Sequence, residues 1–428
     1  MPTPGQSSGQ SSAGTALETT PWGSVFMFCG LFAIFGFVTW LNGPLITFSK
    51  LAFSLSDVEA FLVPSVFYLS YFFLALPSAF ILRKTGMKTG MALGLLAMAI
   101  GAAGFGQFAS MRLFPPTLVS LFVIGAGLSL LQTASNPYIS VLGPIESGAQ
   151  RIALLGIFNK LAGAAAPVLI GTFILNGIGH MQAQVDAAPT TAARDLLLDA
   201  FAARIHLPYL LMGAFLAVIA VLVYKSPLPN ISDDANPGSG KSFVAAIPQM
   251  FFGFLAIFFY VGVEVMAGDA VGTYGNGFNL PLDQTKFFTS FTMVTMLIGY
   301  LCGLVAIPRF TSQEKYLTFS AVLGILFSVG AFLTKGYTSV AFVWALGFAN
   351  AMMWPAIFPL GIRGLGKLTE FGAAFLVMGI IGGAVIPQLF AHFKDQYGFQ
   401  LVFLCLMVPA YLYIFLFGLF AARLAKRG

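Results

Sequence analysis

Residues 136–143 read NPYISVLG and recur 218 residues later as WPAIFPLG at 354–361, with Pro, Ile, Leu and Gly at matching places. A second pair of motifs has nearly the same offset. The run GAAAP at 163–167 resembles GAVIP at 383–387, 220 residues later. Proline and glycine are common in membrane helices, so either match alone is weak. Two matches at nearly one offset indicate that the chain consists of two related halves.

Both pairs of motifs lie in long apolar stretches, and the composition of the chain is that of a membrane protein. Of the 428 residues, 58% are hydrophobic and 8% are charged, and the mean hydropathy is +0.89. The hydrocarbon core of a bilayer is about 30 Å thick, so a crossing helix needs about 20 apolar residues and admits few charges. We therefore predict an all-α membrane protein.

The apolar stretches leave room for twelve transmembrane helices in two pseudo-symmetric six-helix bundles. Their predicted boundaries are 23–50, 57–83, 88–110, 113–142, 150–177, 206–225, 243–273, 283–307, 315–334, 337–362, 370–392 and 398–422. The longest hydrophilic interruptions lie near 178–205 and 226–241, and the second divides the chain. The predicted organisation is a disordered cytoplasmic tail at 1–21, an N-terminal bundle at 22–225, a cytoplasmic linker at 226–241 and a C-terminal bundle at 242–428.

The positive charges are unevenly distributed between the two sides of the predicted membrane. With the N-terminus inside, 13 Lys and Arg residues fall on the side of both termini and seven on the opposite side, while Lys160 lies within a span. An excess of Lys and Arg marks the cytoplasmic side. The net charge of +6 therefore predicts cytoplasmic termini and is no sign of nucleic-acid binding.

Two amide side chains in the fourth predicted span are candidates for binding a sugar. Gln132 and Asn136 are four residues apart, so they share one face of a helix. Gln132 lies about 15 Å from the cytoplasmic helix end at Gly143, near the middle of the membrane. Amides can donate to and accept from sugar hydroxyls. The alternative is an interhelical hydrogen bond that only packs the bundle.

Ionisable residues within or near the spans are candidates for coupling transport to a cation. Lys160, next to Asn159, is costly at its depth unless it faces water or a carboxylate. Glu264 is well inside the seventh span, where burial suits a carboxyl group to exchanging a proton or holding Na⁺. Asp269 lies nearer the surface, and Lys160 would compete with the cation for Glu264. The alternatives are a static Lys160–Glu264 ion pair and a solvated Asp269 at a helix end.

Aromatic side chains offer a surface for the C–H face of a sugar ring. Trp40, which lies near the polar Asn42, is one candidate, and Tyr260 in the seventh span is another. Trp354 lies near Asn350 in the tenth span. The alternative role for such residues is to anchor helices at the membrane interface. The residues predicted to line the sugar site are Gln132, Asn136, Asn159, Trp40, Asn42, Asn350 and Tyr260.

No arrangement of residues predicts an enzyme or a bound cofactor. The three histidines, His180, His206 and His392, lie at loops or span ends and form no cluster with metal-ligand spacing. No phosphate-binding loop of the GxxxxGK[ST] kind occurs, so nothing supports ATP-driven transport.

The run from Leu131 to Pro144 resembles the signature of the fucose–galactose–glucose symporter family, part of the major facilitator superfamily. Further matching stretches are 258–269, 354–366 and 378–387, so the resemblance covers nearly all of the chain after the tail. It implies two six-helix bundles with parallel repeats, a substrate site between them near the midplane, and alternating access. Carriers of this architecture usually need one chain, so we expect a monomer in the lipid bilayer.

Within this family the chain is most similar to the branch for glucose, galactose and N-acetylglucosamine. Asn159-Lys160 followed by Ala162-Gly163, and the Gly-Val-Glu-Val run around Glu264, carry this resemblance. It implies secondary active sugar uptake across a bacterial inner membrane, driven by a proton or sodium gradient. The proton is the favoured coupling ion.

The chain also departs from the fucose branch. That branch has an acidic residue after the Asn of the first helix, where Gly43 follows Asn42 here, and a Glu where Gln132 stands. Both carboxylates assigned there to proton coupling are therefore missing. A sugar-contacting glutamine of the fifth helix is replaced by Gly156. Coupling would have to use another acid, with Glu264 the first candidate and Asp269 the second.

Three functions remain open at this point. The first is a cation-coupled symporter for a hexose or N-acetylhexosamine, and the second is an uncoupled facilitator in which Lys160 permanently takes the place of the cation. The third is a sugar sensor on a transporter scaffold. The sensor is disfavoured, because only about 16 residues separate the halves and no long signalling domain is visible.

Overall fold

The computed structural model describes residues 22–141, 148–226, 243–307, 309–363 and 365–425. At 136–141, 148–153, 243, 245, 367, 370 and 422–425 it describes the backbone alone. The predicted tail, and all of the predicted linker except Ser226, lie outside the described residues. Within the described ranges every regular element is helical, and twelve helical segments are long and apolar enough to cross a membrane. This confirms the all-α membrane fold and the twelve predicted spans.

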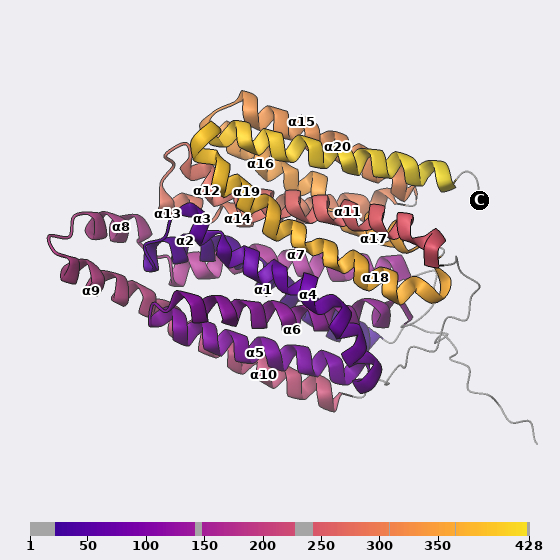
Figure 1. Cartoon of the computed structure of the whole chain (residues 1–428), viewed down its shortest axis with the longest axis horizontal. Coiled ribbons are helices and arrows are strands. Elements are labelled where there is room, and N and C mark those ends of the chain that lie inside the picture. The colour runs from indigo at the N-terminus through magenta and orange to yellow at the C-terminus, as the bar shows by residue number, and fades with distance from the viewer. Residues whose placement is uncertain (1–21, 142–147, 227–242, 308, 364, 426–428) are drawn as a thin grey trace, which may run out of the picture.

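The helices before and after the linker gather into two groups that lie on opposite sides of the molecule (Figure 1). The first group consists of α1 (Trp22–Thr39), α2 (Asn42–Ala52), α3 (Asp57–Ala60), α4 (Leu62–Thr85), α5 (Met87–Ser110), α6 (Phe114–Val141), α7 (Gly148–Phe173), α8 (Ile178–Asp186), α9 (Thr191–Ala202) and α10 (His206–Lys225). The second consists of α11 (Phe243–Gly268), α12 (Val271–Asn276), α13 (Leu282–Thr285), α14 (Phe288–Ala306), α15 (Gln313–Leu333), α16 (Gly336–Asn350), α17 (Met353–Ile362), α18 (Thr369–Met378), α19 (Gly382–Tyr397) and α20 (Phe399–Ala425). We call these groups the first and second halves.

The first and seventh spans are broken at a similar depth, which the apolar pattern alone did not predict. Trp40 and Leu41 separate α1 from α2, and Asp269 and Ala270 separate α11 from α12. The predictions of one continuous helix over 23–50 and over 243–273 are therefore wrong at these points. The predicted helix over 337–362 is likewise interrupted, at Ala351 and Met352. The hydroxyl of Thr289 donates to Gly268 O (2.8 Å). Such side-chain donors satisfy carbonyls that a broken helix leaves without their usual partner, so the break can be buried.

The interruption near 178–205 is not an irregular loop, because it folds into the helices α8 and α9. The side chain of Thr190 caps α9 by accepting from Ala193 N (3.2 Å). Arg112 then holds α9 by pairing with Asp195 (3.1 Å) and Asp199 (3.0 Å), which lie one helical turn apart. The two helices project beyond the bundles in Figure 1. We call this side of the molecule the hairpin end.

The two halves are in polar contact at the hairpin end, first through α3 and α19. Asp57 Oδ2 pairs with Lys394 Nζ of the second half (2.5 Å), while Asp57 Oδ1 pairs with Lys50 of its own half. Beside this pair, Gln388 Nε2 donates to Val58 O (2.9 Å). These bonds join elements more than 300 residues apart in the chain.

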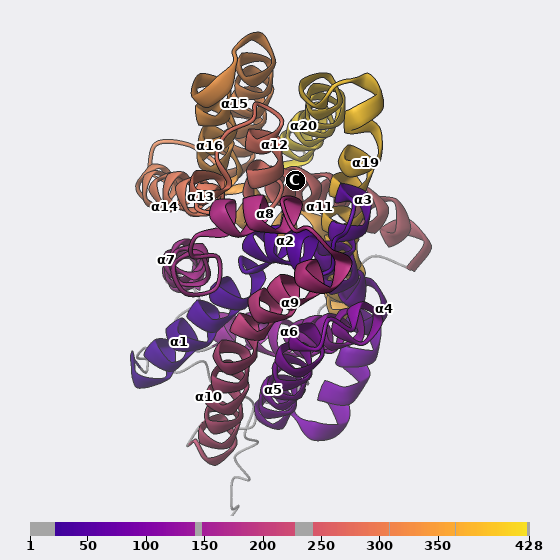
Figure 2. The ribbon, with the colours of Figure 1, turned by 90° about the vertical axis from the view of Figure 1, so that its left-hand side faces the viewer.

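A second polar contact lies between α8 and α13, which Figure 2 shows next to each other at the hairpin end. Gly179 N donates to Asp283 Oδ2 (3.2 Å), and Lys286 Nζ donates to Leu175 O (2.9 Å). Lys286 is almost fully buried and also pairs with Asp283. Together the two contacts hold the hairpin ends of the halves against each other.

Candidate functional site

The indole ring of Trp40 lies between the two halves because glycines leave room for it on both sides. It projects from the break between α1 and α2 and is 2% exposed. A methyl group at Gly163 of α7 would clash with one edge of the ring, and one at Gly268 of α11 would clash with the other. Gly163 opens the duplicated GAAAP motif, so this motif provides the space that Trp40 occupies.

Lys160 and Glu264 form an ion pair across the interface between the halves. Lys160 Nζ of α7 lies 3.0 Å from Glu264 Oε1 of α11, and both side chains are about nine-tenths buried. The same ammonium group stands 4.8 Å above the centre of the Trp40 ring. A cation at that distance is attracted to the electron-rich face of an indole. Lys160 is thus held by one residue from each half.

Tyrosine side chains surround the carboxylate of Glu264. Tyr260 lies one turn earlier on α11, is 2% exposed, and has its ring 6.3 Å from that of Trp354. Tyr300 of α14 packs against Gly156 of α7, from the other half. Both tyrosines interact electrostatically with Glu264. The ion pair therefore lies in a buried aromatic interface, in which a charge without a partner is expensive.

Asp269 is a second buried carboxylate at the interface, five residues after Glu264. It lies at the break between α11 and α12 and is 2% exposed. Its Oδ2 accepts a hydrogen bond from the hydroxyl of Tyr68 on α4 (3.2 Å). Its Oδ1 has no hydrogen-bond partner among the described residues. The prediction left open a solvated Asp269 at a helix end, and the structure instead buries this residue.

Tyr68 is a functional candidate that no sequence pattern indicated. Its ring packs against Gly383 of α19, where a methyl group would lie 3.1 Å from Tyr68 Cδ2. Gly383 opens the second copy of the duplicated motif, just as Gly163 opens the first. Each copy therefore leaves room for an aromatic ring of the first half that contacts a charged side chain. The repeat indicated close packing, but nothing in it identified the ring.

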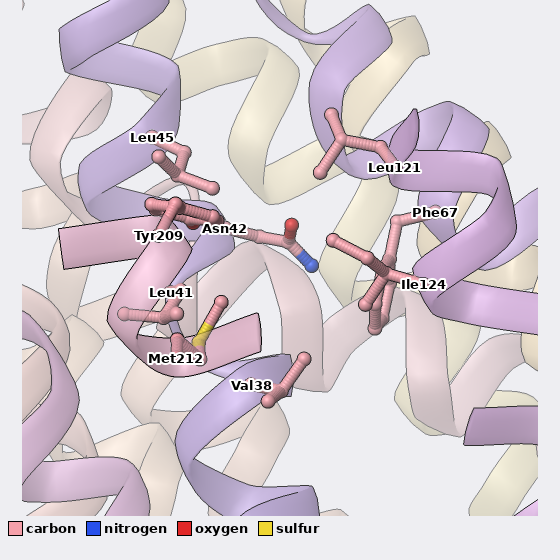
Figure 3. A pocket seen from close by; sticks show the side chains of 9 residues that line it. All are labelled: Val38, Leu41, Asn42, Leu45, Phe67, Leu121, Ile124, Tyr209 and Met212. Atoms are coloured by element: carbon pink, nitrogen blue, oxygen red, sulfur yellow. The ribbon is translucent and has the colours of Figure 1, made fainter. Parts of the chain in front are cut away.

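Two of the predicted sugar-site residues lie inside their own halves rather than between them. Asn42, at the start of α2, points into a small cavity of about 10 Å³ (Figure 3). The cavity is lined by Val38, Leu41, Asn42, Leu45, Phe67, Leu121, Ile124, Tyr209 and Met212, all of the first half. Asn350 is fully buried in the second half, where its Oδ1 accepts from the hydroxyl of Tyr411 (2.8 Å). Tyr411 also interacts electrostatically with Glu264, so Asn350 is one side chain removed from the ion pair.

The remaining polar candidates differ in what surrounds them. Asn159 is half-buried and its Nδ2 donates to Phe32 O (3.2 Å), which ties α7 to α1. A packing bond of this kind was the alternative role predicted for Gln132 and Asn136 in the fourth span. Gln132 is half-buried on α6. The side chain of Asn136 lies outside the described residues.

The sequence profile described as Major Facilitator Superfamily matches residues 27–387. The chain belongs to this superfamily. It is 31% identical over 403 residues to a protein of Brucella abortus named glucose/galactose transporter, with 92% of each chain covered. It is 29% identical over 382 residues to the L-fucose-proton symporter of Escherichia coli K12, with 87% of each covered.

Solved structures of the superfamily have the same fold. The outward conformation of the transporter FucP matches with a TM-score of 0.74 and 27% identity, covering 93% of this chain and 98% of that one. Together with the relatives, this match places the chain in the fucose–galactose–glucose symporter family of the superfamily. The resemblance drawn from the sequence is confirmed.

Proposed function

We propose that this member of the Major Facilitator Superfamily imports a hexose or N-acetylhexosamine by symport with a cation. The names of its relatives support a sugar of the glucose, galactose or fucose kind. The observation that carries the coupling is the buried cluster of Lys160, Glu264 and Asp269 between the halves. Ionisable groups buried in a membrane protein are costly and are usually kept for function.

The cluster also explains how a cation can be linked to the movement of the halves. Lys160 belongs to the first half and both carboxylates belong to the second, so their attraction depends on how the halves are arranged. A cation that binds a carboxylate changes the charge that must be buried when the halves close. Two ligands that favour the same arrangement help each other to bind. A proton needs no set of oxygen ligands and is the favoured cation, with Na⁺ the second candidate.

The sugar site proposed from this arrangement is centred on the interface aromatics. Trp40 and Tyr260 offer rings for stacking, and Gln132 and Asn136 offer amides on α6. Asn159 remains a candidate if its bond to Phe32 opens on binding. Asn42 and Asn350 fit a supporting role better, because each lies within its own half.

We further propose that the chain lies in a bacterial inner membrane with both termini in the cytoplasm. The excess of Lys and Arg on the terminal side supports this orientation. The hairpin end is then external, and the polar contacts between the halves at that end correspond to a carrier closed toward the outside.

Uptake into energised vesicles tests the symport. Labelled sugar should accumulate above its external concentration, and a protonophore should collapse this accumulation. We expect Glu264→Gln to abolish accumulation and to leave counterflow exchange largely intact, because exchange needs sugar binding but no cation cycle. Removing one partner of a buried ion pair costs about 3–5 kcal/mol, so the folded fraction of the variant must be measured alongside. Equal loss of accumulation and exchange in folded protein would contradict a coupling role for Glu264.

An uncoupled facilitator is the second candidate, and the 3.0 Å contact of Lys160 with Glu264 favours it. In this function Lys160 permanently fills the place of the cation. Uptake would then stop at equilibrium and would not respond to a protonophore or to Na⁺. Competition of labelled N-acetylglucosamine uptake by glucose, galactose, mannose and fucose, at several pH and Na⁺ values, identifies the sugar and the ion together.

A further inference from the structure

The buried cluster holds one cation for two carboxylates. Lys160 Nζ pairs with Glu264 Oε1 at 3.0 Å, so this ion pair neutralises itself. Asp269 is the more deeply buried carboxylate, at 2% exposure, and no described cation pairs with it. With both carboxyl groups ionised, the closed interface would therefore carry one uncompensated negative charge. A proton on a carboxyl group neutralises this charge without a further ligand.

The groups that face Asp269 come from five helices, and they neither neutralise it nor satisfy both its oxygens. The hydroxyl of Tyr68 on α4 donates to Oδ2, while the hydroxyl of Thr289 on α14 donates to Gly268 O instead. Gly43 of α2 packs closely enough that a methyl group there would lie 3.4 Å from Oδ1. The charged groups that act on Asp269 are Glu264 of α11, which repels it, and Lys160 of α7, which is already paired. The backbone amide of Gly43 also acts on the Asp269 carboxyl group, but Oδ1 accepts no well-formed hydrogen bond from the described residues. As a carboxylate, Asp269 would therefore be buried with one well-formed hydrogen bond, from Tyr68, and no cation of its own.

We propose that the transported proton is carried by Asp269, with Tyr68 as its positioning residue, while the Lys160–Glu264 pair stays ionised throughout the cycle. This inference rests on the proposed symport and names the group that titrates. The proton comes from water on the side to which the carrier is open and leaves to water on the other side. One O–H bond of the Asp269 carboxyl group forms and later breaks, and no other bond changes.

The position of Asp269 couples this proton to the movement of the halves. Tyr68 and Gly43 belong to the first half and Asp269 to the second, so both of these contacts with the carboxyl group cross the interface. Separation of the halves at the hairpin end exposes Asp269 to water, where it can gain or lose a proton. Closure around a charged Asp269 would bury an uncompensated anion, so the protonated carrier closes much more readily.

Proton movement in proteoliposomes that contain the purified full chain tests this assignment. Glucose or galactose added outside should raise the external pH, as read by a pH-sensitive dye. Asp269→Asn should abolish the pH change and reduce accumulation at least tenfold, to equilibration, while counterflow exchange continues. If the wild type accumulates sugar with Na⁺ and no proton, or shows no coupling at all, the proposed proton symport itself fails.

A charge-balanced double variant tests whether Asp269 or Glu264 carries the proton. Glu264→Gln alone leaves Lys160 free to neutralise Asp269 in place of the proton, so this single variant loses accumulation whichever carboxyl group carries the proton. Lys160→Met combined with Glu264→Gln removes the ion pair as a unit and leaves Asp269 as the last carboxylate of the cluster. Sugar-driven proton uptake should persist in this variant, at a reduced rate. Loss of proton uptake in a variant that still exchanges sugar would overturn the assignment and return it to Glu264. Retention of proton uptake by Asp269→Asn would overturn it equally.

The pH dependence of uptake by Tyr68→Phe distinguishes a positioning role of Tyr68 from a purely structural one. Without the hydroxyl donor the charged form of Asp269 is less favoured, so the group keeps its proton to higher pH. The decline of uptake on the alkaline side should shift upward by about half a pH unit or more. An unchanged pH profile, with only a lower rate at every pH, would show that Tyr68 does not position Asp269.

Discussion

At the scale of single residues, the site depends on glycines, because their missing side chains leave room for aromatic rings. Gly163→Ala would place a methyl group against Cδ1 of Trp40, a rigid ring held on its other side by Gly268. Overpacking of this kind costs about 1–3 kcal/mol. We expect the variant to displace the ring from Lys160 and to lower the initial rate of sugar uptake at least fivefold.

Gly30→Ala is the matched control for this change. A methyl group at Gly30 of α1 would meet no other atom within 4 Å, so uptake and thermal stability should stay at the wild-type level. Uptake by Gly163→Ala equal to that of the control would mean that the position of Trp40 is unimportant for transport.

Single residues were predictable from the sequence where burial is expensive. Lys160 and Glu264 stand out because a charge in an apolar span needs a partner, and the structure pairs them. Tyr68 did not stand out, because tyrosine is common in membrane spans and its partner is 201 residues away. Asn42 and Asn350 were predicted to line the sugar site and stay predictions. The structure buries Asn42 among side chains of the first half and bonds Asn350 to Tyr411 of the second, and the chain order of these residues could not predict either neighbourhood.

At the scale of helices, the broken seventh span depends on threonines of α14. Thr292 Oγ1 donates to Ala267 O and Thr289 Oγ1 to Gly268 O, both at 2.8 Å, just before the break at Asp269. Thr292→Val keeps the shape of the side chain and removes the donor. A buried acceptor left unsatisfied costs about 1–3 kcal/mol, so we expect a lower midpoint of thermal unfolding.

Thr292→Ser is the control, because it keeps the hydroxyl group and removes a methyl. Its thermal stability should lie much closer to that of the wild type than that of Thr292→Val. The reverse order would mean that the methyl group, and not the hydrogen bond, stabilises the end of α11.

Hydropathy predicted where helices lie, but it could not predict where they break. A break changes few residues from apolar to polar, and the groups that make it tolerable come from another helix. The helices α8 and α9 were missed for a related reason. They lie outside the apolar stretches and are held by the cap at Thr190 and by the pairs of Arg112 with Asp195 and Asp199.

At the scale of the whole molecule, the ion pair of Asp57 with Lys394 helps to keep the hairpin ends of the halves together. Asp57→Asn should weaken this contact and shift the population toward opening at that end by up to about fivefold, which corresponds to the upper value of about 1 kcal/mol for a surface ion pair. Cysteines introduced in place of Ser65 and Gln388, in a background without the native cysteines, report the change. Ser65 Oγ and Gln388 Oε1 lie 3.3 Å apart across the two halves. We expect slower cross-linking in the variant.

Lys50→Met is the matched control at whole-molecule scale. Lys50 also pairs with Asp57, but it belongs to the same half and is half exposed. Its loss leaves the contact between the halves intact, so cross-linking should change little. Equal slowing in both variants would mean that Asp57 acts through its own half.

The duplicated motifs predicted two matched bundles, because an internal repeat records how a chain is built. They could not predict how the bundles meet. The interface depends on pairs such as Tyr68 with Asp269 and Val58 with Gln388, which have no counterpart within either repeat.

The helices α9 and α10 follow one another through a single short turn, and the helical segment Thr191–Lys225 runs for 35 residues. Such a rod is about 50 Å long, and its inner part is packed against α5 of the first half. When the first half tilts during a transport cycle, the outer end of this segment is therefore displaced further than the part packed against α5. A fluorophore at the exposed Leu196, paired with a quencher on the second half, would make each turnover of a single carrier visible as a change in brightness.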